Sequence, residues 1–127
     1  MTTRIHGHVD FSRLAPVVDI KLVSGKNGEI ELAAIIDTGY NGEVILSENK
    51  IHEMGLEFLG TIDTELADGE IVELELFRGR IKWFDTIREI AIGASQSDDV
   101  LLGTLLLADC ELYVNFKEGS VRIEQLP

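Results

Sequence analysis

The stretch AAIIDTGYNGEVIL, residues 33–46, runs four apolar residues directly into the polar triplet Asp37-Thr38-Gly39 and becomes apolar again at Val44. Four apolar residues in a row are typical of a strand buried in a sheet. A carboxylate at the end of such a strand is costly to bury unless neighbouring groups satisfy it. Thr38 offers a hydroxyl, and Gly39 permits a sharp bend that brings its backbone N–H close to the carboxylate. We therefore expect a tight loop that presents Asp37 at the floor of a cleft.

The same triplet is open to a second interpretation, because aspartate and glycine are also common residues of ordinary surface turns. The chain contains two further Asp-Thr pairs that serve as internal controls, Asp63-Thr64 and Asp85-Thr86. Neither pair is followed by glycine, and neither comes after a run of four apolar residues. The sequence context therefore distinguishes Asp37 from the other two aspartates.

Most of the remaining chain alternates apolar and polar residues with period two, which is the pattern of half-buried strands. A short helix is expected after Ser47, which can cap it, and before Gly55, which can end it. No strand–helix–strand alternation is present. We expect a mainly β, closed or sandwich-like antiparallel fold with one or two short helices. The seven or eight strands are expected around residues 18–22, 29–36, 44–46, 61–66, 72–83, 87–92, 112–116 and 121–123.

The chain length of 127 residues suits one domain. Residues 16–127 carry the strand patterns and are expected to form that single domain. Residues 1–15 lack clear periodicity, so a flexible N-terminal arm is expected there. His6 and His8 in this arm could share a metal ion, but no third ligand lies near them in the sequence, and we expect no metal site.

The formal net charge is −12, from 23 acidic and 11 basic side chains. Charge of this sign is repelled by phosphate backbones and by anionic lipid surfaces, so no nucleic-acid or membrane partner is expected. No apolar run of 18 residues is present, and residues 1–15 contain no apolar segment of a secretory signal. The one cysteine, Cys110, cannot form an internal disulfide and is expected to be a structural thiol. These features together predict a cytoplasmic location.

Three segments resemble the small, retroviral-like class of aspartic proteases, and most closely its bacterial single-domain members. Residues 33–46 resemble the active-site loop of that class. Leu66-Ala67-Asp68-Gly69 lies where the class has its flap, a hairpin that covers bound substrate, and Asp-Gly is itself a strong hairpin signal. Leu101-Leu102-Gly103 resembles the element that supports the catalytic loop from below. The resemblance extends from Pro16 to about Ile123, and the agreement of three segments in order makes it specific.

This resemblance implies a small closed antiparallel β-barrel and an aspartic endopeptidase that needs no metal or cofactor. Aspartic proteolysis uses two carboxylates about 3 Å apart that share one proton and activate a water. Since the chain has one such triplet, the resemblance implies a homodimer in which each subunit contributes Asp37. It also implies that Thr38 bonds across the twofold axis and that the Gly39 N–H donates to Asp37. The flap residues, which would close over a peptide or protein substrate, are Ala67, Asp68 and Gly69. The supporting residues, which would pack beneath the loop, are Leu101, Leu102 and Gly103.

Tyr40 departs from the retroviral pattern, and Asp68 adds a charge to the predicted flap. Tyr40 replaces the small residue that usually follows the triplet, and its ring would either narrow the cleft or pack under the loop. Asp68 adds negative charge beside the cleft, which disfavours acidic peptides and favours basic or apolar ones.

Two other functions are compatible with the same residues. The fold could bind peptides without cleaving them, or act as a dimerisation module. The chain could also be an unrelated β-barrel binding protein in which Asp37 lies in an exposed turn. Two Asp37 carboxyl groups within reach of one water would favour the peptidase over both alternatives.

Overall fold

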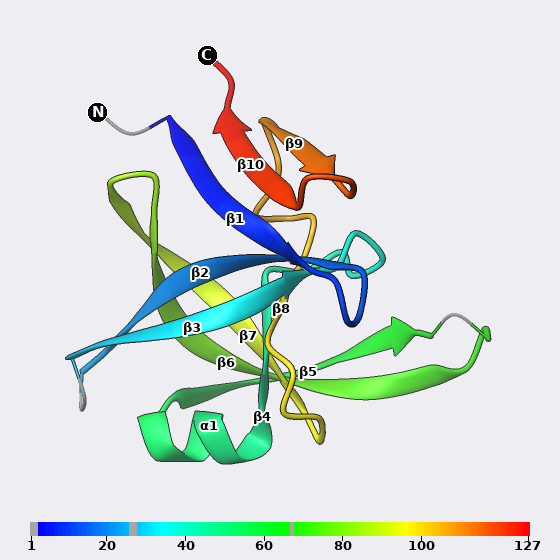
Figure 1. The fold of residues 1–127 in the computed structure, drawn as a ribbon. Helices are drawn as coiled ribbons and strands as arrows, with labels where there is room; N and C mark the ends of the chain where they lie inside the picture. The colour runs from blue at the N-terminus through cyan, green and yellow to red at the C-terminus, as the bar shows by residue number, and fades with distance from the viewer. Residues whose placement is uncertain (1–2, 26–27, 67) are drawn as a thin grey trace.

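The computed structural model describes residues 3–25, 28–66 and 68–127. These residues form a mainly β molecule with one short helix, as the sequence predicted (Figure 1). Two strands, β1 and β8, come in addition to the eight expected. In chain order the elements are β1 (Arg4–Asp10), β2 (Ala15–Ser24), β3 (Gly28–Ile36), β4 (Val44–Ser47), α1 (Glu48–Met54), β5 (Glu57–Glu65), β6 (Ile71–Trp83), β7 (Thr86–Ser95), β8 (Leu101–Leu102), β9 (Cys110–Asn115) and β10 (Ser120–Gln125).

Six of the strands close into a ring in the order β6, β7, β4, β8, β3 and β2. The ring closes where Lys21 and Leu22 of β2 pair with Lys82 and Ile81 of β6. Strand β5 extends the sheet from β6, whereas β1, β10 and β9 extend it from β2. The expected small closed barrel is therefore confirmed, and closure leaves no free sheet edge within the ring.

Not every strand pair in the ring is antiparallel. Strand β8 lies between β3 and β4, and it runs parallel to β3 and antiparallel to β4. Strand β4 is also parallel to β7. The barrel therefore combines antiparallel pairs with two parallel ones, β3–β8 and β4–β7. Strand β8 is inserted between β3 and β4, the two strands that the loop at residues 37–43 connects.

Apolar side chains from the ring strands fill the interior of the barrel, as their period-two alternation predicts. The strands outside the ring add Val9, Val121 and Ile123 to the same core. Leu22, Leu46, Ile81, Ile92 and Leu102 are among the fully buried side chains.

The helix α1 begins and ends where the sequence signals predicted. The Ser47 side chain accepts a hydrogen bond from the Lys50 N–H at 3.1 Å, and Gly55 ends the helix in the left-handed conformation with φ 64°. Ile51 and Met54 face the core. No helix among the described residues is long and apolar enough to cross a membrane.

The N-terminal segment differs from the expected flexible arm, because Arg4–Asp10 forms strand β1. This strand pairs with β10 from Arg4 to His8 and with β2 from His8 to Asp10. Its inner face carries Ile5, Gly7 and Val9, and a Cβ at Gly7 would overlap the backbone of Val17. Glycine at the central position removes one apolar residue from the alternation, which is why the strand pattern was not evident in the sequence.

Candidate active site

The loop between β3 and β4 folds back on the Asp37 side chain. The Gly39 N–H donates to Asp37 Oδ1 at 2.9 Å, which is the hydrogen bond expected from the sequence. The Tyr40 N–H donates to the Asp37 carbonyl oxygen at 3.2 Å. Asp37 is half-buried, whereas Thr38 and Gly39 are exposed. The loop therefore holds a carboxylate at the end of an interior strand and leaves its tip accessible to a second molecule.

The segment at residues 101–105 supports this loop along its whole length. The Asp37 N–H donates to the Leu102 carbonyl oxygen at 2.9 Å, and the Gly103 N–H donates to the Glu43 carbonyl oxygen at 2.8 Å. The Thr104 N–H donates to the Tyr40 carbonyl oxygen at 2.8 Å. The structure thus places Leu102 and Gly103 against the loop, while Leu101 pairs with Ile35 and Ile45 of the flanking strands.

The Tyr40 ring packs against two glycines rather than projecting freely from the loop. A Cβ at Gly42 would overlap this ring, and a Cβ at Gly103 would overlap both the ring and the Gly42 carbonyl oxygen. Burial, with a smaller contribution from the carboxylate of Glu43, raises the pKa of the Tyr40 hydroxyl. Of the two placements considered for this bulky residue, the structure supports packing against the loop, although Tyr40 also lines the adjoining cleft.

Glu43 and Thr104 also hold the loop in place, and sequence reasoning did not identify either. Glu43 Oε1 accepts a hydrogen bond from the Ala91 N–H at 2.9 Å, which connects the loop to β7. The Thr104 hydroxyl donates to the Tyr40 carbonyl oxygen at 3.3 Å. Both partners are backbone groups far away in the chain, so no local sequence signal identifies these contacts.

A cleft of about 650 Å³ lies between the loop and the β5–β6 hairpin. Figure 1 shows the hairpin projecting from the barrel on the same side as the loop. Apolar side chains line the cleft beside the carboxylates of Glu43, Asp63 and Glu65, and no Lys, Arg or His is among its lining residues in the described chain. Such a cleft suits a peptide with apolar side chains next to basic ones. The lining residues are Gly39, Tyr40, Asn41, Gly42, Glu43, Ile62, Asp63, Thr64, Glu65, Leu66, Leu76, Ala91 and Leu105.

The hairpin predicted around Asp68-Gly69 is present. Its tip is closed by hydrogen bonds from the Leu66 N–H to the Glu70 carbonyl oxygen at 2.7 Å and from the Gly69 N–H to the Leu66 carbonyl oxygen at 2.9 Å. Gly69 has φ 86°, and Asp68 Oδ1 accepts from the Glu70 N–H at 2.9 Å. Ala67, the remaining predicted flap residue, lies outside the described residues.

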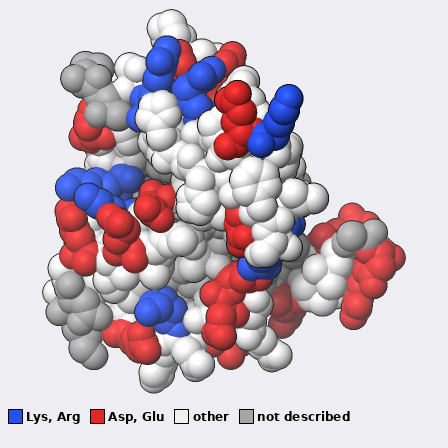
Figure 2. Space-filling view, in the orientation of Figure 1, with Lys and Arg blue, Asp and Glu red and all other residues white. Residues whose placement is uncertain are grey.

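Negative charge is concentrated on this hairpin. Residues 61–75 contain six carboxylates and no Lys or Arg. Figure 2 shows acidic side chains gathered at its projecting end. Strand alternation places Ile62 and Thr64 on one face of β5 and Asp63 and Glu65 on the other. The hairpin is therefore less polar on one face than on the other, where two carboxylates stand side by side.

The other candidate residues lie in less specialised positions. Asp63 is exposed on β5, and Asp85 lies in the tight β6–β7 turn with φ 65°, so neither has the setting of Asp37. Cys110 is half-buried at the start of β9, and burial together with the Asp109 carboxylate raises the pKa of its thiol. A raised pKa disfavours the reactive thiolate, which agrees with a structural role. His6 and His8 are exposed on β1, where they are paired with Arg122 and Ser120 of β10.

Comparison with known proteins supports the fold. No protein-family model matches the chain, and a search of curated proteins finds no match. Among solved structures, the chain matches the crystal structure of a retropepsin-like aspartic protease from Rickettsia conorii with a TM-score of 0.63. The match covers 96% of this chain and 90% of that chain at 14% sequence identity. The protein therefore has the retropepsin-like fold, which confirms the fold expected from the three sequence segments.

Proposed function

We propose that the protein is an aspartic endopeptidase that acts as a homodimer, with one Asp37 carboxylate supplied by each subunit. The observation that carries this proposal is the construction of the Asp37 loop within a retropepsin-like fold. The Asp37 carboxylate is half-buried and accepts a hydrogen bond from the Gly39 N–H at 2.9 Å. The Asp37 backbone N–H donates to the Leu102 carbonyl oxygen. Such rigid support suits a group that must be positioned within a fraction of an ångström of a reacting water.

The need for a second subunit follows from the chemistry. Two carboxylates sharing one proton are required, and the chain has a single Asp-Thr-Gly triplet. Thr38 and Gly39 are exposed beside Asp37, so another copy can approach the carboxylate from the side that the barrel leaves open. A twofold axis next to this loop would bring the two Asp37 side chains together.

In the proposed reaction, a water is held between the two Asp37 carboxyl groups. The ionised carboxylate takes a proton from this water, whose oxygen attacks the carbonyl carbon of the scissile peptide bond. The protonated carboxyl group donates its proton to the carbonyl oxygen. When the tetrahedral intermediate collapses, the C–N bond breaks, and the carboxyl group that took the proton from water gives it to the leaving nitrogen. The other carboxylate takes a proton back from the hydroxyl of the intermediate as the C=O bond re-forms, so the pair again shares one proton. The two Asp37 side chains and one water supply every group that this reaction needs.

The proposed substrate is an extended peptide that lies between the loop and the β5–β6 hairpin. Its apolar side chains would contact Ile62, Leu76 and Leu105, which line the cleft. The six carboxylates of residues 61–75 would attract basic residues near the scissile bond and repel acidic ones. We propose that the hairpin tip, with Ala67, Asp68 and Gly69, is the flap that closes over this peptide.

The test is peptide hydrolysis by Asp37→Asn, with Asp85→Asn as the matched control. Asp85 also precedes a threonine, and its left-handed backbone conformation is one that asparagine tolerates well. We expect Asp37→Asn to lower kcat by about 10²–10⁴-fold, the usual contribution of general acid–base catalysis, while its thermal unfolding is unchanged. Asp85→Asn should retain activity. Undiminished cleavage by Asp37→Asn would refute the proposal, and peptide binding without cleavage by the wild-type chain would favour the binding module.

A further inference from the structure

The β1–β2 turn displays two large apolar side chains to solvent in a fixed conformation. Phe11 is 55% exposed and Leu14 is 64% exposed. Within the turn, Asp10 Oδ1 accepts from the Ser12 N–H at 3.1 Å and from the Ser12 hydroxyl at 2.7 Å. The Arg13 N–H donates to the Asp10 carbonyl oxygen at 3.2 Å. Phe11 and Leu14 are therefore exposed by a well-ordered turn rather than by a loose one.

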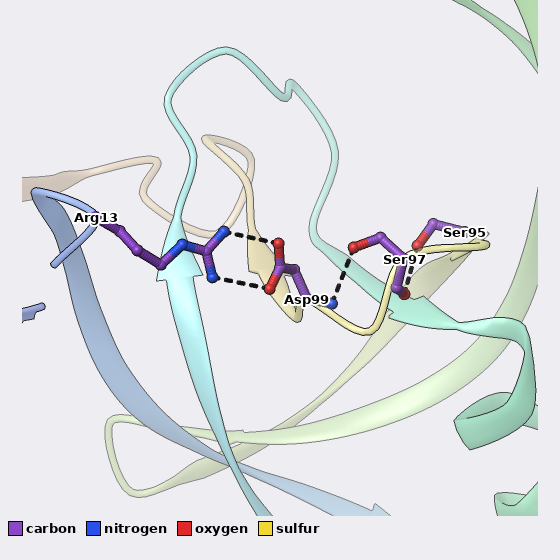
Figure 3. Close-up of polar contacts among 4 residues, drawn as sticks. All are labelled: Arg13, Ser95, Ser97 and Asp99. Atoms are coloured by element: carbon purple, nitrogen blue, oxygen red, sulfur yellow. Dashed lines mark hydrogen bonds and ion pairs between the residues drawn. The ribbon is translucent and has the colours of Figure 1, made fainter.

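A two-pronged ion pair joins this turn to the segment that precedes β8. Arg13 Nη1 and Nη2 donate to Asp99 Oδ1 and Oδ2 at 2.9 and 2.8 Å (Figure 3). The Asp99 N–H in turn donates to the Ser97 hydroxyl oxygen at 3.1 Å. Two residues further along, β8 begins and supports the Asp37 loop. One short segment therefore contacts both regions: Asp99 binds the β1–β2 turn, and Leu102 binds the Asp37 loop.

Leu14 has a backbone conformation that leucine rarely adopts. Its φ is 50°, in the left-handed region, where glycine and asparagine are favoured because they avoid the steric penalty of a larger side chain. With 64% of the residue exposed, packing within the chain gives little compensation for this strain. An observed outlier of this kind motivates a hypothesis of function for the residue, here a contact outside its own chain.

The turn lies at the same end of the sheet as the Asp37 loop. Val17 of β2 is paired with Ile35 of antiparallel β3. Because the two strands are antiparallel, Leu14, three residues before Val17, and Asp37, two residues after Ile35, lie at the same end of this pair. The exposed apolar side chains of the turn therefore lie beside the Asp37 loop.

We infer that Phe11 and Leu14 form a contact surface for a second copy of this chain, next to the two Asp37 loops. The identity of the partner rests on the proposed function, since the site is incomplete without a second subunit. Charge favours this turn over the apolar residues of the hairpin as the self-association surface. The Arg13 charge is matched by Asp99, whereas two hairpins with six carboxylates each would repel one another.

The test is the dimer dissociation constant of Leu14→Asn, measured by sedimentation over a range of concentrations. The substitution removes an apolar contact twice in a twofold dimer, so we expect the dissociation constant to rise about 100-fold. Asparagine suits the left-handed conformation, so the melting temperature of the monomer should not fall. Ile87→Thr is the matched control, because Ile87 is 56% exposed on β7 and should leave the dissociation constant unchanged.

The outcomes separate this inference from the proposed function when peptide hydrolysis is measured on the same samples. A dimer that Leu14→Asn leaves intact, or a wild-type chain that stays monomeric, would overturn the inference. If the intact dimer still hydrolyses peptides, the peptidase proposal stands without this surface. A dimer that Leu14→Asn weakens, but that hydrolyses no peptide at any concentration, supports the surface and removes the peptidase. Phe11→Ser provides an independent second variant with the same expected direction.

Discussion

The Asp37 loop and the tip of the β5–β6 hairpin border the same cleft but are held in opposite ways. A separate segment supports the loop, with hydrogen bonds that join Leu102 to Asp37, Gly103 to Glu43, and Thr104 to Tyr40. At the hairpin tip, hydrogen bonds join Leu66 to Glu70, Gly69 to Leu66, and Glu70 to Asp68, all within residues 66–70. A reacting carboxylate requires fixed geometry, whereas a cover must open to admit a peptide. This contrast fits the proposed function, in which one wall of the cleft carries the reacting carboxylate and the other admits and selects the substrate.

Gly103→Ala should have the largest effect on this contrast, because it disturbs the rigid wall of the cleft, formed by the Asp37 loop and its supporting segment. The added methyl group would meet the backbone oxygens of Gly42 and Tyr40, which cannot move without displacing the loop. We expect a loss of about 3 kcal/mol in the free energy of unfolding, the upper end of the cost of overpacking. Urea denaturation measures it. Gly25→Ala is the control, since a Cβ there has no neighbour within 4 Å, and an equal loss in both variants would contradict the role of Gly103.

Tyr40→Ala should weaken the same wall by a smaller amount. The substitution removes a half-buried ring that packs over Gly42 and Gly103, and the expected loss is about 2 kcal/mol of unfolding free energy. Peptide hydrolysis should fall as well, because the loop loses the group that fixes its position. Thermal unfolding of Tyr40→Ala and Tyr40→Phe would distinguish the ring from its hydroxyl. A Tyr40→Phe variant as unstable as Tyr40→Ala would show that the ring is not the source of the effect.

Charge reversal on the hairpin should alter selection without altering the rigid wall. In the double variant Asp63→Lys, Glu65→Lys, kcat/KM for a peptide with flanking lysines should fall about tenfold relative to one with flanking glutamates. The shift should shrink at 1 M salt, where the Debye length is about 3 Å. Glu111→Lys on β9 is the control for charge reversal away from the cleft. An unchanged ratio in the double variant would mean that the hairpin does not select substrates by charge.

Tyr40→Phe should have the smallest effect, visible only at high pH. Burial, and secondarily Glu43, raises the pKa of Tyr40 above its usual value of 10.0. The folded protein therefore holds this proton more tightly than the unfolded chain does. The resulting stability is fully present below about pH 10 and is lost as the pH rises through the raised pKa. Unfolding free energies measured from pH 8 to 11 should decline less steeply in Tyr40→Phe, and parallel curves would contradict this role for the hydroxyl.

The sequence predicted the features that depend on local patterns. The apolar run before Asp37 and the glycine after Thr38 indicated the loop, and Asp68-Gly69 indicated a hairpin. Both are present because strand periodicity and turn chemistry act over a few neighbouring residues. The helix between Ser47 and Gly55 was predictable for the same reason.

The features that the sequence did not predict depend on distant partners. Strand β8 has only two residues, too few to show a period, and it exists because β3 and β4 flank it on both sides. Strand β1 was hidden by Gly7, whose missing side chain leaves room for the backbone of β2. Glu43 holds the loop through an N–H of β7 that lies 48 residues further along the chain. Contacts of this kind become visible only when the barrel is closed.

The central claim, that two Asp37 carboxylates from two chains form one active site, is tested most directly by mixing wild-type protein with inactive Asp37→Asn. At concentrations above the dimer dissociation constant, a ninefold excess of the variant should leave about one-tenth of wild-type chains in wild-type dimers. The account therefore predicts that the rate of peptide hydrolysis per wild-type chain falls to about one-tenth. A rate that stays constant as the variant is added would show that one chain is sufficient, and would contradict the account.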